Sequence, residues 1–332
     1  MSSMSPPVWG ERALAAPRSC LSLPRLRCPS CRKDMSSFES GSQWTCAGCD
    51  FVIRKEKGIL RALQPNRERY FQQFIRDYET VRAREGRGSV SPEYYLSLPD
   101  KDLTGCNSWQ WQIRARTFHC LERRILPAIE RAHPLGCDLL DIGAGNCWFS
   151  CRMALRGHRP VAVDLLDNDW DGLGAARHYL SRLPSSFPRF VAEMDSLPFA
   201  TGQFDIVVFN ASFHYSVDYF VTLTEALRCL RRPGFVILAD SPLYAREESG
   251  QAMLAEKRAA FQRQFGFSSD SIPSREYLTK ASLEELQRRL PLRWKMVTPW
   301  YGLQWAMRPW KARLLRQREP SRFHLIYSEV LE

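Results

Sequence analysis

The sequence predicts an α/β protein whose core is a doubly wound, mostly parallel sheet. Two short apolar segments, Leu139–Ile142 and Val161–Val163, are separated by a glycine turn and a stretch long enough for a helix. Two further apolar runs, Phe204–Phe209 and Phe235–Ala239, follow at similar intervals. Continuous apolar runs of this length are typical of strands that are buried on both faces, as in a parallel sheet covered by helices.

The first strand ends at a glycine turn that indicates a nucleoside-binding βαβ unit. Gly143 and Gly145 allow the backbone to turn sharply and to approach a ligand closely. Asp164 ends the second strand nineteen residues after Gly145, where a carboxylate can accept hydrogen bonds from both hydroxyls of a ribose. A dinucleotide site would need Gly or Ala at the position of Trp148, so the sequence favours a ligand with a ribose but no pyrophosphate.

The later strands carry polar residues at their ends. Phe190–Asp195 is expected to form a third strand that ends on a carboxylate, and the fourth strand ends near Asn210. Asp205 opens the fourth strand at the end away from the ligand crevice of such a sheet, so we expect it to be structural. Leu230–Gly234 is expected to turn into the fifth strand.

In order and spacing, these motifs resemble the core of class I S-adenosylmethionine-dependent methyltransferases, and most of all the small-molecule group that includes quinone-biosynthesis C-methyltransferases. The resemblance covers roughly residues 137–242. It implies a Rossmann-like sheet of seven strands and S-adenosyl-L-methionine as the cofactor, with Asp195 facing the adenine. The cofactor-binding residues that it implies are Asp141, Gly143, Ala144, Gly145, Asp164, Leu165, Asp195, Ser196, Asn210, Ala211 and Arg114.

Two residues just past the fourth strand are candidates for catalysis. His214 and Tyr215 follow the carboxyl end of that strand, which is where doubly wound sheets bind their ligands. A histidine can take up a proton near neutral pH, although packing or substrate contact is the simpler role of a single histidine. Methyl transfer mainly requires that the acceptor be aligned and, for some acceptors, that a proton be removed.

Two C-x2-C pairs near the start of the chain indicate a metal site. The four cysteines, separated by fourteen residues between the pairs, are Cys28, Cys31, Cys46 and Cys49. Two such turns supply the four thiolates of a closed, structural zinc site, and Gln43–Thr45 and Phe51–Ile53 are expected to be its short strands. We assign a zinc ribbon to residues 26–64; redox-active or unrelated cysteines are the alternative.

Residues 65–132 are predicted to be a helical linker that also covers the site. Apolar and aromatic side chains recur at helical spacing over residues 66–88. The resemblance implies that a segment in this position covers the methionine end of the cofactor, where Arg114 could pair with the cofactor carboxylate. The candidates for such contacts are Tyr94, Tyr95, Trp111 and Arg114, although core packing or surface pairing is the simpler role of each. Cys147, beside the glycine turn, is expected to be a buried free thiol like the other unpaired cysteines, with exposure to the ligand as the alternative.

Residues 133–332 are assigned to the methyltransferase domain, with substrate-side additions from Asp240 onward. The expected helices and closing strands of the additions are Ala252–Phe265, Leu283–Leu290, Val297–Gly302 and Phe323–Val330. Trp300, Tyr301, Trp305 and Trp310 form either a binding wall or a packed edge beside a solvated helix.

The composition limits the partners and the cellular location that we expect for the protein. The formal net charge is +11, and the excess of cations lies outside residues 133–245. That charge suits an anionic partner such as RNA or a phosphorylated metabolite, but scattered arginines are also typical of a solvated surface. Paired cysteines among a total of eleven suit a metal site in a reducing compartment, so we expect a cytoplasmic location. Residues 1–25 are expected to be a flexible leader, and no apolar run is long enough to span a bilayer.

These observations favour a methyltransferase that acts on a small-molecule or lipid-like acceptor. A ribosomal or transfer RNA base methyltransferase, in which the ribbon aids RNA binding, is one alternative. A non-catalytic zinc-ribbon interaction protein is another, although the intact glycines and Asp164 argue against it.

Overall fold

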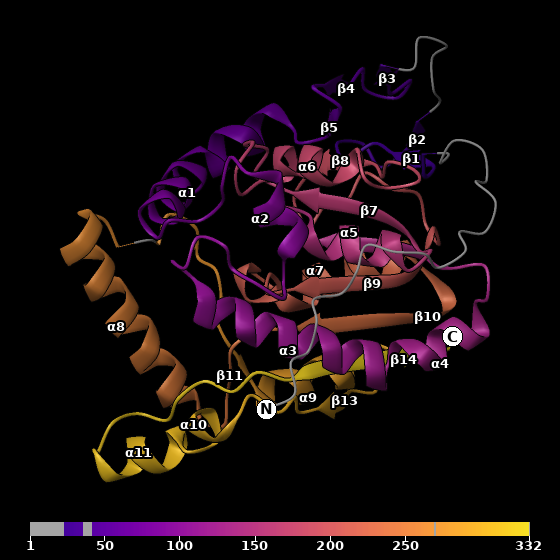
Figure 1. Ribbon diagram of the computed structural model, residues 1–332. Coiled ribbons are helices and arrows are strands. Elements are labelled where there is room, and N and C mark those ends of the chain that lie inside the picture. Colours follow the sequence, from indigo (N-terminus) through magenta and orange to yellow (C-terminus); the bar gives the residue numbers. More distant parts are fainter. Residues whose placement is uncertain (1–22, 36–41, 269, 332) are drawn as a thin grey trace.

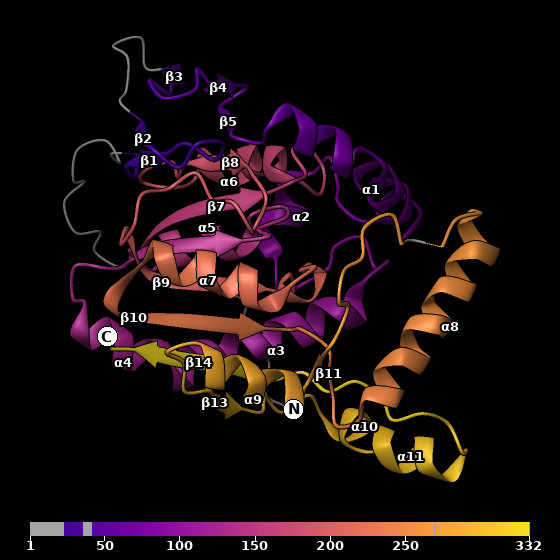
Figure 2. The same cartoon turned by 180° about the vertical axis from the view of Figure 1, so that it is seen from behind.

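The computed structural model describes residues 23–35, 42–268 and 270–331, and one sheet runs through them (Figure 1). The predicted leader lies almost entirely outside the described residues. The ten strands of this sheet are ordered β13-β14-β10-β9-β6-β7-β8-β5-β4-β3. Helices cover both of its faces, as the two opposite views show (Figures 1 and 2). Within the described residues, no helix is both long enough and apolar enough to cross a bilayer.

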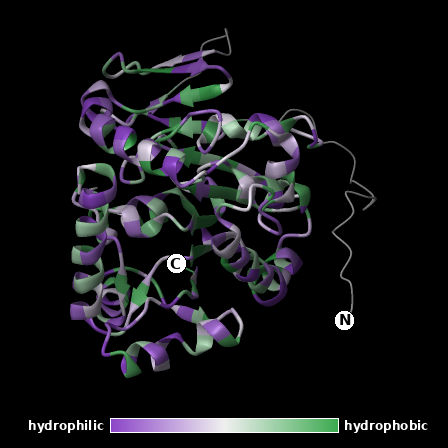
Figure 3. Ribbon diagram, turned by 60° about the vertical axis from the view of Figure 1, so that its left-hand side comes forward, coloured by the Kyte–Doolittle hydropathy of each residue, from purple (hydrophilic) through white to green (hydrophobic). Residues whose placement is uncertain are grey.

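Seven of these strands form the predicted doubly wound sheet, in the order β8-β7-β6-β9-β10-β14-β13. Neighbouring strands from β8 to β10 are parallel, and β14 pairs antiparallel with both β10 and β13. Their central residues are apolar, which Figure 3 shows as green strands between helices of mixed colour. The strands are β6 (Asp138–Ile142), β7 (Arg159–Asp164), β8 (Arg189–Val191), β9 (Phe204–Asn210), β10 (Leu230–Ala239), β13 (Lys295–Val297) and β14 (Leu325–Val330).

The chain order reverses at β6, which positions the site. From β6 the chain continues to β7 on one side, whereas β9 lies on the other side. The crevice above the carboxyl ends of β6 and β9 is therefore the switch point at which open α/β sheets bind ligands.

Three of the five ribbon strands extend the core sheet, whereas β1 and β2 pair with each other in a small separate sheet. β5 pairs in parallel with β8, and through it β4 and β3 join the edge of the sheet. Trp44 and Ile53 of the ribbon are buried in one cluster with Phe190 and Phe199 of the core. The ribbon strands are β1 (Leu26–Arg27), β2 (Asp34–Met35), β3 (Gln43–Thr45), β4 (Val52–Glu56) and β5 (Ile59–Arg61).

Each face of the sheet has its own helical layer. On one face, side chains of α3, α4 and α5 pack with Leu139 and Ile206 of the sheet. On the other face, α7 and α9 pack with Leu140 and Val207. The helices are α1 (Pro65–Arg84), α2 (Pro92–Ser97), α3 (Ser108–Arg124), α4 (Leu126–Ala132), α5 (Trp148–Leu155), α6 (Arg177–Leu180), α7 (Tyr219–Cys229), α8 (Glu247–Phe265), α9 (Lys280–Arg289), α10 (Leu303–Ala306) and α11 (Arg308–Leu314). Short 3-10 turns span Leu173–Ala176 and Phe213–Tyr215, and the small strands β11 (Leu243–Tyr244) and β12 (Leu278–Thr279) pair with each other.

Several predicted boundaries are wrong. The strand expected at Val297–Gly302 is β13, which ends at Val297; Pro299 has no amide hydrogen to donate to a neighbouring strand. α8 begins at Glu247, five residues before the predicted start at Ala252. β8 ends at Val191, so Asp195 lies on the following loop and not at the end of a strand.

Candidate functional site

The turn after β6 requires glycine at its first position. Gly143 has a φ of +74°, in the left-handed region that favours glycine. A Cβ atom at this position would lie 2.2 Å from the Cβ of Ser212, because the loop after β9 crosses directly over the turn. Gly145, with a φ of +51°, has an open approach, and a Cβ there would meet only the carbonyl oxygen of Asp171 at 3.6 Å.

Asp164 holds the other side of the turn. Its carboxylate accepts hydrogen bonds from the amides of Gly145 at 2.8 Å and of Leu166 at 2.9 Å. Burial raises the pKa of Asp164, and these backbone amides oppose the rise. Each carboxylate oxygen has a second lone pair, so both can also accept a hydroxyl from a ligand.

A cavity lies along the carboxyl ends of β6, β7 and β9, and most of the predicted site residues line it. These residues are Gly143, Ala144, Gly145, Asp164, Leu165, Asp195, Asn210, Ala211, Tyr215 and Arg114. Asp195 accepts a hydrogen bond from the hydroxyl of Thr222 on α7, which fixes its carboxylate at one end of the cavity. We call this space the first cavity.

Helix α1 covers the first cavity. One face of α1 lines it through five residues that recur every three or four positions: Arg67, Phe71, Phe74, Tyr78 and Arg82. This spacing places them on a single stripe of the helix. Sequence reasoning recognised the aromatic face of α1 but did not assign Arg67, Arg82 or the facing Asp171 to the site, although all three line the cavity.

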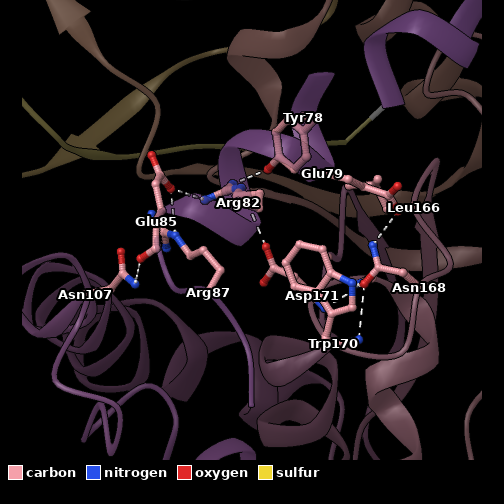
Figure 4. A network of polar contacts seen from close by, with 12 residues as sticks. Tyr78, Glu79, Arg82, Glu85, Arg87, Asn107, Leu166, Asn168, Trp170 and Asp171 are labelled. Carbon is pink, nitrogen blue, oxygen red and sulfur yellow. Dashed lines mark hydrogen bonds and ion pairs between the residues drawn. The ribbon is translucent and has the colours of Figure 1, made fainter. Parts of the chain in front are cut away.

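Ion pairs fasten α1 at both ends. Near its start, Arg67 donates to the carboxylate of Glu193 at 2.7 Å. Near its end, the Nε atom of Arg82 lies 3.6 Å from the carboxylate of Asp171, and Arg82 also donates to the hydroxyl of Tyr78 (Figure 4). Burial raises the pKa of Asp171, and the positive charge of Arg82 opposes that rise. These contacts hold the helix over the loops that follow β7 and β8.

Arg114 of α3 lines the first cavity without an ion pair among the described residues. Its guanidinium stacks over the ring of Trp111, 4.8 Å from the ring centroid. Burial lowers the pKa of Arg114 to about 10, and the charges of Arg87 and Arg82 act in the same direction. The charges of Asp240 and Asp171 oppose this lowering, but neither carboxylate forms an ion pair with Arg114. A half-buried cation without an ion pair can bind an anionic group of a ligand.

Two of the predicted cofactor residues do not line the cavity. Asp141 is fully buried under the turn, where it accepts a hydrogen bond from the hydroxyl of Ser150 at 2.7 Å. Burial raises the pKa of Asp141 to about 7. Ser196 lies farther out and donates to the carbonyl of Pro29 at 3.3 Å. Both residues therefore support neighbouring chain segments.

Most of the expected covering residues are core residues. Tyr94, Tyr95 and Trp111 are buried, and none of them lines either cavity. The hydroxyl of Tyr95 donates to the carbonyl of Trp170 at 2.6 Å, so it holds α2 against the loop after β7. Cys147 is likewise buried completely, because its left-handed backbone turns the side chain into the core and away from the ligand space.

A second and larger cavity, of about 700 Å³, adjoins the first. The two share six lining residues: Phe74, Tyr78, Arg82, Arg114, Ala211 and Tyr215. Four aromatic side chains from different segments, Trp109, Phe261, Trp305 and Phe323, form an aromatic wall on one part of it. The rest of its lining includes six charged side chains: Glu85, Arg87, Asp240, Lys257, Glu276 and Arg308. Of the expected C-terminal wall, Trp305 takes part, whereas Trp300 and Trp310 are exposed and Tyr301 is buried in the core.

The two catalytic candidates lie at this junction. His214 lines only the second cavity, and burial lowers its pKa to about 4. Its imidazole is therefore neutral at physiological pH and only weakly basic. Tyr215 lines both cavities, and burial raises its pKa, so its hydroxyl stays protonated. Either side chain can hydrogen-bond an acceptor, but neither is a strong base.

The four paired cysteines come together at the tips of the ribbon. Their sulfur atoms all lie within 4.8 Å of one another. The Sγ atoms of Cys28 and Cys49 are 3.5 Å apart, and those of Cys31 and Cys46 are 3.4 Å apart. The amide of Gly48 points to the Sγ of Cys46 at 3.3 Å, as backbone amides do around metal-bound thiolates.

Parts of the chain are similar to a known family and to solved structures. Residues 140–238 match the family model described as a methyltransferase domain. A solved S-adenosylmethionine-dependent methyltransferase from Thermotoga maritima, described as a possible histamine N-methyltransferase, is 16% identical, with 79% of this chain and 99% of that chain covered and a TM-score of 0.43. The YcgJ protein from Bacillus subtilis is also 16% identical, with 60% and 93% covered and a TM-score of 0.43.

A geranyl diphosphate methyltransferase in complex with GPP and sinefungin is 14% identical, with 59% of this chain and 72% of that chain covered and a TM-score of 0.42. No sequence among the curated proteins matches the chain.

Proposed function

We propose that this chain, whose residues 140–238 match a family model described as a methyltransferase domain, is an S-adenosylmethionine-dependent methyltransferase of class I, and we propose a cofactor pose and an acceptor class for it. The cofactor would lie in the first cavity, and the acceptor would be a small, lipid-like molecule seated in the second. The observation that carries this proposal is that the two cavities meet at Arg82, Arg114, Ala211 and Tyr215.

The residues of the first cavity fit S-adenosyl-L-methionine. Asp164 would accept the two ribose hydroxyls, and Asp195 would face the adenine amino group. Arg114 would pair with the carboxylate of the methionine part, since it has no ion pair among the described residues. The cofactor supplies a methyl group on a positively charged sulfur.

The residues around the junction align the acceptor and exclude water. Phe74 and Tyr78 of α1 close the junction from above, while Ala211 and Tyr215 form its floor. A neutral His214 can accept a hydrogen bond or a proton from the acceptor in the second cavity. Its low basicity suits an acceptor group that is already nucleophilic or acidic, because such a group needs little help in losing a proton.

The second cavity supports a compact acceptor with a large apolar part. Its aromatic wall would bury the body of such a molecule, and a volume of about 700 Å³ is within the range of small-molecule sites. Arg308 lies beside this wall, stacked over the ring of Trp305 at 3.7 Å from its centroid, and can hold a polar or anionic end.

We also propose that the four cysteines bind a structural zinc ion. Four thiolates close the tetrahedral shell and leave no position for a substrate, so the ion would hold the ribbon together and take no part in the reaction.

The test of this function is methyl transfer from a labelled cofactor. We expect purified protein and S-adenosyl-L-methionine with a labelled methyl group to label the lipid-extractable or metabolite fraction of a cell extract. The Arg114→Gln variant should label it at least about tenfold less, because a charge-assisted hydrogen bond to the cofactor is lost. Label that enters only the RNA fraction would support the RNA alternative and contradict a lipid-like acceptor, and no label in any fraction would contradict both.

A further inference from the structure

We propose that residues 300–316, which include α10 and α11, bind the surface of an anionic lipid membrane beside the opening of the second cavity. We call these residues the interfacial segment. They lie at the lower edge of the molecule, at the opposite end from the ribbon strands (Figures 1 and 2). The choice of a lipid-like acceptor rests on the proposed function, but the membrane contact stands on the surface of this segment alone.

The interfacial segment exposes an apolar stripe. Leu303 is 72% exposed, Met307 64%, Trp310 84% and Leu314 84%. The amide of Met307 donates to the carbonyl of Leu303, and that of Lys311 to Met307, so helical bonding continues from α10 into α11. At 3.6 residues per turn, the four apolar side chains fall within an arc of roughly 60° on this helical segment.

The opposite side of the segment faces the protein. Trp305 stacks against Phe323, with ring centroids 5.4 Å apart, and lines the second cavity. Ala312 is buried as well. These inward contacts pack the segment against the protein, so the outward stripe is not needed to pack the described residues. Contiguous exposed apolar side chains of this size indicate a binding surface.

Cations flank the stripe. Residues 300–318 contain five Lys or Arg residues and no Asp or Glu. Lys311, Arg313 and Arg316 are exposed and form no ion pair with any described residue. Arg308 also has none and points toward the second cavity, whereas Arg318 pairs with Glu256 at 2.7 Å.

This combination favours an anionic bilayer over other partners. Leucine, methionine and tryptophan side chains can enter the acyl boundary, while flanking cations contact anionic headgroups. An RNA surface would rely on aromatic faces for stacking, and Trp310 is the single aromatic residue of the stripe. A two-fold contact between copies would bring Lys311 and Arg313 close to their own counterparts, which would repel.

The membrane contact has a consequence for the acceptor. Trp305 and Arg308 line the second cavity from the inner side of the same two helices whose outer side carries the stripe. Docking through the stripe would therefore place the aromatic wall of the cavity at the lipid surface. A membrane-dissolved amphiphile could then enter without crossing bulk water.

Flotation of the full-length chain with lipid vesicles tests the contact. We expect co-flotation with vesicles that contain phosphatidylglycerol and at least about tenfold less with pure phosphatidylcholine, because several cations contribute to binding. Two double variants should each weaken flotation at least about tenfold: Leu303→Ser with Trp310→Ser, and Lys311→Glu with Arg313→Glu. The matched control is Val90→Ser with Leu135→Ser, two side chains that are 92% and 68% exposed but lie elsewhere.

The readouts separate this proposal from the proposed function. Binding of S-adenosyl-L-methionine, measured by calorimetry, should be equal in wild type and all variants, because the stripe is remote from the first cavity. Absent flotation, or flotation that the stripe and charge variants leave unchanged, would overturn the membrane contact. Two other outcomes would also overturn it, if vesicles bind no protein. In one, the protein binds transfer RNA and these variants abolish that binding. In the other, the protein sediments as a dimer and these variants abolish the dimer. A failed cofactor titration with intact flotation would instead overturn the proposed function.

Discussion

At the scale of single residues, the glycine turn is the most constrained part of the site. Gly143 combines a positive φ with the close approach of Ser212, so no other side chain fits there. We expect Gly143→Ala to weaken binding of S-adenosyl-L-methionine by about tenfold or more, because the turn must move to relieve the contact.

Titration calorimetry checks this prediction. Gly105→Ala is the matched control, since Gly105 has the same φ of +74° and no atom within 4 Å of the added Cβ. Equal affinities in the two variants would mean that the geometry of the turn does not govern cofactor binding.

Asp164 and Asp141 belong to the same βαβ motif, but we expect their substitutions to affect different properties: cofactor affinity for Asp164 and stability for Asp141. Asp164→Asn should reduce cofactor affinity by about tenfold or more, because a neutral amide is a poorer acceptor for ribose hydroxyls and for the two backbone amides. Asp141→Asn should lower the urea midpoint of unfolding and leave affinity nearly unchanged, because Asp141 contacts Ser150 and not the cavity. If Asp141→Asn lost more cofactor affinity than Asp164→Asn, Asp141 and not Asp164 would be the carboxylate that binds the cofactor.

The predicted residues that line the first cavity come from local motifs. Gly143 and Asp164 belong to one βαβ unit that is readable in the sequence, and Asn210 ends the apolar run of β9. Tyr94 and Trp111 were placed less well, since an aromatic residue before the first strand fits a core as well as a ligand wall. Only the packing of α2 and α3 against α5 decides between the two.

At the scale of elements, the aromatic face of α1 lines the ligand cavity, whereas the aromatic residues Tyr94 of α2 and Trp111 of α3 pack in the core. A helical period of aromatic residues predicts a helix with one apolar face, but the period does not tell what the face covers. Its use as the roof of the first cavity depends on Arg67 and Arg82, which pair with Glu193 and Asp171 far along the chain. Such pairs leave no pattern in the sequence.

Helix α3 offers a pH-dependent contact. His119 lies 2.8 Å from a carboxylate oxygen of Asp100 and 2.9 Å from one of Glu122. The hydrogen bond to Asp100, followed by that to Glu122, raises the pKa of His119 to about 9. In the folded state the histidine therefore keeps its proton above the unfolded pKa of about 6.5.

The sign of the effect follows from this raised pKa. The contribution of His119 to stability is fully present below about pH 6.5 and is lost as the pH rises through about 9. His119→Gln should lower the urea midpoint at pH 6 and leave it unchanged at pH 10. A difference that grows with pH would contradict a protonated His119 in the folded protein.

At the scale of the whole molecule, three strands of the ribbon, β3, β4 and β5, belong to the same sheet as the core. A doubly wound sheet of seven strands was predictable from the apolar runs and the family resemblance. The pairing of β5 with β8 was not, because backbone hydrogen bonds between edge strands leave no side-chain signature. This pairing makes the ribbon a part of the core, with Trp44 and Ile53 buried beside Phe190.

The shared core makes the metal a determinant of overall stability. We expect about one equivalent of zinc per chain in metal analysis of freshly purified protein. Cys49→Ser should lose the metal and lower the free energy of unfolding by at least about 2 kcal/mol, because the packing around Trp44 and Ile53 loosens. Cys106→Ser, which changes an exposed cysteine outside the cluster, should keep both. Less than half an equivalent of zinc in the wild type would contradict the site.

The most direct measurement for the central claim is a crystal structure of the full chain with S-adenosylhomocysteine. The account predicts the ribose on Asp164, the adenine beside Asp195, and the sulfur directed to the junction at Ala211 and Tyr215, facing the second cavity. An adenosine bound elsewhere, or a sulfur turned away from that junction, would contradict it.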